Sequence, residues 1–127
     1  MKFEDLTLEE LKKYFDGAFF DSSIQTDASN TSYLAVDGHT KANVDIVGNN
    51  ILKYSTSFTI DDMTPPQVEQ FCKDFTRGFM LVKAIPSEAG IHFEHDAYFL
   101  EDEEVDPKKV IQLFRLFLDV VNSRPQE

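Results

Sequence analysis

The sequence predicts an α+β domain: an antiparallel sheet of about five strands, element order α-β-β-β-α-β-β-α, with the helices mainly on one face. Three observations predict this class. Capping residues open three helical stretches, turn residues separate the strand stretches, and apolar residues alternate along the longest strand. At 127 residues the chain is long enough for one domain, residues 1–127, and too short for two.

The three expected helices all begin at recognisable capping residues. Thr7 and Glu10 form a capping box before the first helix, and Gly17 is suited to end it. Thr64 and Gln67 form a second capping box, with proline at the first helical position. An Asp-Pro pair opens the third helix in the same way. The helices are expected over residues 8–17, 65–78 and 108–122.

The expected strands are bounded by turn residues. In the longest one, Leu52 and Tyr54 fall on one face and Lys53 and Ser55 on the other, which is typical of a sheet with one buried face. The strands are expected over residues 33–36, 42–47, 51–60 and, as a hairpin, within 79–100. Residues 18–31 indicate either a short strand or a docked loop, with a turn at 27–32, and residues 123–127 are expected to fray.

Charge and cysteine content indicate the class of partner and the compartment. The net charge of −11 opposes binding to phosphate backbones and anionic lipids, so we expect a protein or peptide client, preferably basic, and neither nucleic acid nor membrane. A single cysteine, Cys72, excludes an intrachain disulfide and favours a reducing compartment. The chain also has no secretory signal or membrane span, so we expect a cytoplasmic protein.

The sequence predicts no enzyme, no cofactor and no metal site. His92 and His95 lie three apart on an expected strand, so their rings should face opposite sides of the sheet. The acidic run 101–104 lacks the ligand spacing of a calcium loop and favours a solvated turn. Cys72 has no histidine near it in sequence, which favours a structural thiol. Nucleotide-binding and hydrolase motifs are absent as well.

The last helix is apolar nearly all round, which predicts that it is covered on more than one side. In so small a chain a second subunit could supply the second cover, so we expect a homodimer. Val110, Ile111 and Leu113 are expected to face the core. The residues expected to carry self-association are Phe114, Phe117, Leu118 and Val121.

Four segments of the second half resemble the YbjN family of small bacterial proteins, within the type III secretion chaperone-like fold. They read PPQVEQFCKDFTRGF, FMLVKAIP, IHFEHDAYFL and DPKKVIQLFRLFLDVV. The first half resembles the fold by element order. The resemblance implies a small, acidic, cytoplasmic and non-enzymatic protein, and chaperones of this fold commonly dimerise and wrap an extended client segment.

The sequence and the resemblance together indicate two candidate functions. The leading one is a non-catalytic protein-binding module of a bacterial cytoplasm, either chaperone-like or a regulatory adaptor, whose client pairs with exposed sheet through its main chain. The alternative is a module that senses a small molecule or lipid in a pocket between sheet and helices. That pocket would be lined by Tyr54, Phe58 and Phe93.

Overall fold

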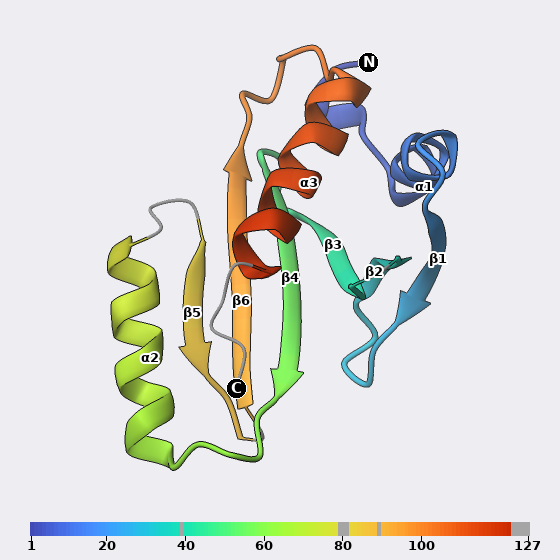
Figure 1. Cartoon of the computed structure of the whole chain (residues 1–127). Helices are drawn as coiled ribbons and strands as arrows, with labels where there is room; N and C mark the ends of the chain where they lie inside the picture. Colours follow the sequence, from blue (N-terminus) through green and yellow to red (C-terminus); the bar gives the residue numbers. More distant parts are fainter. Residues whose placement is uncertain (39, 79–81, 89, 123–127) are drawn as a thin grey trace.

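The computed structural model of the chain describes residues 1–38, 40–78, 82–88 and 90–122 (Figure 1). Its helical elements are η1 (Phe3–Asp5), α1 (Leu8–Gly17), α2 (Pro65–Gly78) and α3 (Pro107–Asn122). Its strands are β1 (Asp21–Thr26), β2 (Ser32–Asp37), β3 (Ala42–Val47), β4 (Ile51–Thr59), β5 (Lys83–Pro86) and β6 (Gly90–Tyr98). The α+β class expected from the sequence is confirmed.

The six strands form one antiparallel sheet in the order β1-β2-β3-β4-β6-β5. The strand beyond the expected five is β1, which comes from the region that the sequence left open. Asp27 explains why β1 can pair with β2. Its Oδ1 accepts hydrogen bonds from the backbone N–H groups of Ser29 and Thr31 at 2.9 and 3.0 Å, which closes the turn between the two strands.

The caps predicted from the sequence are present at all three α-helices. Thr7 Oγ1 accepts a hydrogen bond from the Glu10 N–H at 3.2 Å at the start of α1. At the start of α2, the Thr64 N–H donates to Gln67 Oε1 at 2.8 Å, which completes the capping box. The carboxylate that opens α3 accepts from the Lys108 N–H at 3.0 Å.

All three α-helices pack against the same face of the sheet, here called the inner face. Tyr54 of β4 donates a hydrogen bond from its hydroxyl to the Val110 carbonyl of α3 at 3.0 Å. Phe75 of α2 packs against Phe93 of β6 with ring centroids 5.0 Å apart. Helix α1 then packs against α3 (Figure 1). The opposite face, here called the outer face, is covered by no helix of the described residues.

Several expectations fall on residues outside the described ranges. The hairpin was expected to begin at Phe79, and its first described strand residue is Lys83. His39 and the tail 123–127 also lie outside the described residues.

Candidate functional site

Strand β1 forms one edge of the sheet, and every second residue of β1 points its backbone N–H and C=O groups away from β2. Hydrogen-bonded and non-hydrogen-bonded pairs alternate in an antiparallel ladder. The Asp27 N–H donates to the Thr31 carbonyl at 3.0 Å in the register of the β1–β2 pair, so the odd residues of β1 bond to β2. The even residues, Ser22, Ile24 and Thr26, therefore present N–H and C=O groups to the outside. No other described strand pairs with them.

The opposite edge, β5, is closed by α2, which lies beside it in Figure 1. The Phe99 N–H donates to the Asn50 carbonyl at 2.8 Å in the register of the β4–β6 pair, so the odd residues of β6 bond to β4 and its even residues bond to β5. The β5 residues opposite those even positions are Lys83 and Ile85, so the N–H and C=O groups of Ala84 and the C=O of Pro86 point outward. The Ala84 N–H donates to Thr76 Oγ1 at 3.1 Å, and the same hydroxyl donates to the Ala84 carbonyl at 3.4 Å. Pro86 has no N–H to offer. Natural sheets block their edges by such means, so the contrast leaves β1 as the open edge.

Phe19 lies two residues before β1 and is 97% exposed. Its φ of 68° is in the left-handed region, which costs a residue with a side chain about 1–2 kcal/mol. Two backbone hydrogen bonds hold this turn, from the Phe19 N–H to the Asp16 carbonyl at 3.1 Å and from the Phe20 N–H to the Phe15 carbonyl at 3.0 Å. The turn sends the Phe20 ring toward Phe15, at 5.8 Å, while the Phe19 ring stays in solvent. These two bonds are the Schellman cap of α1 with Phe19 at the left-handed position, and they leave an exposed aromatic ring beside the open edge.

Replacing Phe19 with glycine is expected to stabilise the fold by about 1 kcal/mol, because glycine adopts a positive φ without steric cost and an exposed ring contributes little burial. Urea denaturation followed by circular dichroism measures this change. Phe19→Ala is the matched control, since alanine removes the ring and keeps the strain. A glycine variant less stable than the alanine variant would contradict this account of the turn.

Negative charge flanks both ends of β1. Hydrogen bonds from Lys12 Nζ and Ser22 Oγ, both at 2.7 Å, lower the pKa of Asp16 at the first end. At the other end, the backbone hydrogen bond from Thr31 is the main cause that lowers the pKa of Asp27. Both carboxylates are therefore ionised at neutral pH. Lys12 offsets the charge of Asp16, so the negative field at the open edge comes mainly from Asp27 and from the chain's net charge of −11.

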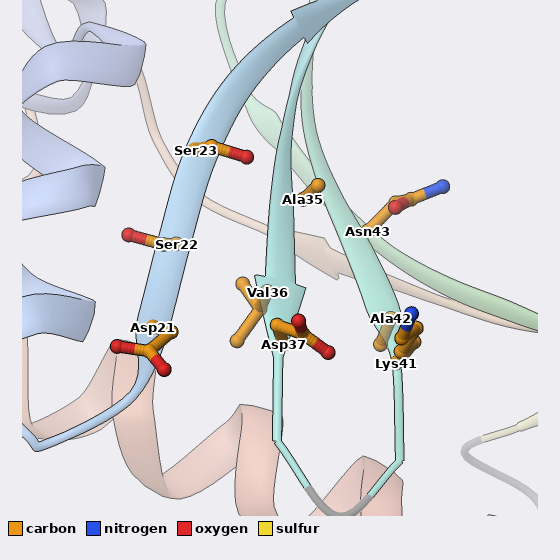
Figure 2. A pocket seen from close by; sticks show the side chains of 9 residues that line it. All are labelled: Asp21, Ser22, Ser23, Ala35, Val36, Asp37, Lys41, Ala42 and Asn43. Atoms are coloured by element: carbon orange, nitrogen blue, oxygen red, sulfur yellow. The ribbon is translucent and has the colours of Figure 1, made fainter.

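A hollow of about 340 Å³ lies beside the first residues of β1, between the ends of three strands (Figure 2). Its described lining residues are Asp21, Ser22, Ser23, Ala35, Val36, Asp37, Lys41, Ala42 and Asn43. Asp21 lies directly opposite Asp37 in the ladder, and like charges in that position repel. Figure 2 shows Asp37 and Lys41 at the same end of the hollow, at the ends of neighbouring strands, with Asp21 on the far side of Asp37. Ala35 has only a methyl side chain, which is too small to fill the hollow.

The structure places three of the four residues expected at a subunit interface inside the chain's own core. Phe114, Phe117 and Val121 are buried, and Leu118 is partly buried. The Phe114 ring packs against Phe15 at 4.9 Å and Phe20 at 5.5 Å, so α1 and the segment after it cover the second side of α3. Their burial argues against these three side chains as the contact residues of a subunit interface. Self-association itself stays a prediction.

Two of the three residues expected to line a ligand pocket are fully buried. Tyr54 is held by its hydrogen bond to α3, and Phe93 packs between Phe58 at 5.8 Å and Phe75 at 5.0 Å. Aromatic rings thus fill the space between the sheet and the helices at this point. The expected lining residues Tyr54 and Phe93 therefore do not line an open pocket.

The two histidines of β6 lie on opposite faces of the sheet. His95 is opposite Tyr54 and stacks on its ring at 6.1 Å on the inner face. On the outer face, His92 Nδ1 lies 2.7 Å from Ser57 Oγ and its Nε2 lies 3.4 Å from Glu94 Oε2. Among the described residues no group of three or more metal-ligating side chains comes together.

The remaining sequence candidates have structural contacts. Cys72 is buried on α2, and burial raises the pKa of its thiol. In the acidic run, Glu104 Oε2 accepts a hydrogen bond from the Met1 amino group at 2.8 Å, and Glu103 lies 3.7 Å from Lys109 Nζ. In the described part of the chain, no helix is long and apolar enough to cross a membrane.

Comparison with known proteins gives a likeness of fold. No protein-family model and no curated protein sequence matches the chain. The crystal structure of YbjN from E. coli, a candidate transcription regulator, superimposes with a TM-score of 0.68 at 11% sequence identity. The match covers 91% of this chain and 86% of that one. The chain therefore has a YbjN-like fold.

Proposed function

We propose that the chain is a non-catalytic protein-binding module that takes an extended segment of a client protein as an added strand beside β1. The observation that carries the proposal is the contrast between the two edges of the sheet. The outward backbone of β5 is blocked by Thr76 and Pro86, whereas the outward N–H and C=O groups of Ser22, Ile24 and Thr26 pair with no described strand. Strand addition uses such groups for affinity and neighbouring side chains for specificity.

Charge and shape support a basic client. The net charge of −11 speeds encounter with positively charged segments, and the ionised carboxylate of Asp27 stands at one end of the edge. Phe19 is positioned as an aromatic anchor next to the edge. YbjN, which shares this fold, is a candidate transcription regulator, which fits a regulatory adaptor, and the negative charge favours regulation through a protein partner over direct contact with nucleic acid.

Ile24→Pro is the test of the binding edge. Proline at this position removes an N–H that points outward and leaves the β1–β2 hydrogen bonds in place, so the fold should survive. We expect at least a tenfold loss of affinity for a client protein recovered from the native host, measured by calorimetry with the purified pair. Ile24→Thr is the matched control, because threonine keeps the N–H and the strand propensity.

Two further readouts complete this test. Circular dichroism must show the same fold for both variants, since a misfolded proline variant would lose binding for another reason. A client that binds the folded proline variant as well as the original chain would contradict strand addition at β1. Light scattering of the original chain and of Ile24→Pro shows whether a second copy occupies the edge, because a dimer paired through β1 would become a monomer.

A further inference from the structure

We infer that the segment bound at β1 alternates apolar residues with lysine or arginine, the apolar ones facing the helices and the basic ones facing the hollow of Figure 2. This inference rests on the proposed strand addition and specifies its partner. It follows from the register of β1, because residues opposite each other in a ladder project to the same face of the sheet.

The side of the added strand that faces the helices requires apolar residues. Ile24 pairs with Leu34, which is buried on the inner face, so the Ile24 side chain also points to that face. It is still 37% exposed, since β1 has no neighbour on its outer side. A partner residue opposite Ile24 would lie against this uncovered surface, and an apolar side chain there removes apolar area from water on both chains.

The other side of the added strand meets the hollow. Partner residues opposite Asp21 and Ser23 project to the outer face, where Asp21 and Asp37 lie opposite each other. Asp21 would be a directly opposite or diagonal neighbour of these partner residues, about 5–8 Å away, and Asp37 lies one strand further, about 10 Å away. A lysine or arginine side chain is long enough to bring its charge over Asp21 and toward Asp37, where it would offset the repulsion between the two carboxylates.

The sequence of β1 itself distinguishes this partner from a second copy of the chain. Strand β1 reads DSSIQT and has no basic residue. Pairing two copies would bring further carboxylates to the hollow, and each chain carries a net charge of −11. The alternating basic pattern therefore points to a different polypeptide.

A displayed library of random decapeptides tests the inference without knowledge of the natural client. The library is selected on the immobilised full chain, and enriched peptides are synthesised and titrated by calorimetry. We expect enriched sequences to alternate apolar and basic residues. We also expect them to lose affinity about three- to tenfold for the double variant Asp21→Asn, Asp37→Asn, and at least tenfold for Ile24→Pro.

The possible results separate the inference from the function on which it rests. Peptides that bind Ile24→Pro as well as the original chain, or a selection that enriches none, would overturn strand addition and the inference together. Two results would overturn the inference and leave strand addition standing, both for peptides that lose affinity for Ile24→Pro. Either the peptides show no alternation of basic residues, or they bind the double variant Asp21→Asn, Asp37→Asn with undiminished affinity. The conservative Asp37→Glu variant should retain peptide affinity, because it keeps the charge.

Discussion

Phe117→Ala is expected to destabilise the fold by about 3–5 kcal/mol and to leave the oligomeric state of the folded protein unchanged. Phe117 is 1% exposed, and its ring lies 6.2 Å from that of Tyr54 in the centre of the core. Truncation would leave a cavity among side chains that are already closely packed. Phe117→Asp should prevent folding altogether, because it buries an unpaired carboxylate. Chemical denaturation combined with light scattering measures both properties.

The neighbouring Leu116 supplies the control for this experiment. It lies on the same helix and is 42% exposed, so Leu116→Ala should change stability by less than about 1 kcal/mol. Both variants alter helix propensity only slightly. If Phe117→Ala kept the original stability and instead dissociated a dimer, the placement of Phe117 in the monomer core would be refuted.

Gly90→Ala is expected to cost about 3 kcal/mol or more, although it adds a single methyl group. A Cβ at this position would overlap the Phe58 carbonyl oxygen and lie 2.8 Å from the Ile60 nitrogen. Both are backbone atoms of the segment that pairs with β6, so they cannot move aside as a flexible side chain would. The end of β4 must separate from β6, and thermal unfolding should show a lower Tm.

Gly17→Ala is the comparison for this substitution. No atom lies within 4 Å of a Cβ at Gly17, and the residue ends α1 without a positive φ. Alanine there should leave stability unchanged or raise it by up to about 1 kcal/mol. Equal behaviour of the two variants would show that the close approach at Gly90 does not exist in solution.

Local signals predicted most of the fold because they act within a few residues. Each helix start is determined by a side chain and a backbone N–H two or three positions away, as at Thr7 and Thr64, and all were predicted correctly. The alternation of Leu52 and Tyr54 with polar residues likewise predicted which face of β4 is buried.

Strand β1 could not be predicted in the same way, because pairing with β2 and not its own pattern makes it a strand. Only Ile24 among its residues is apolar, so there is no alternation of apolar and polar side chains to detect. One signal for an exposed aromatic ring beside this edge was nevertheless present. Phe19 and Phe20 are adjacent after a helix end, and adjacent rings in a tight turn or strand point in different directions, so one of them was bound to be exposed.

The placement of α3 shows why a helix that is apolar on most sides is ambiguous. The sequence shows that a second cover is needed, but not which chain supplies it. Here Phe15 and Phe20 reach Phe114 from the far end of the same chain, a contact across about a hundred residues that no local pattern encodes.

The Thr76 hydroxyl at the β5 edge has a consequence for how copies of this protein can assemble. A sheet with two open edges can join copies head to tail, and such growth has no natural end point and leads to fibres. Because the Thr76 hydroxyl bonds to both the N–H and the C=O of Ala84, a further strand can pair with the described sheet only at β1. If a client strand adds at β1 as proposed, the blocked β5 edge keeps copies of the chain from joining head to tail through both edges of their sheets.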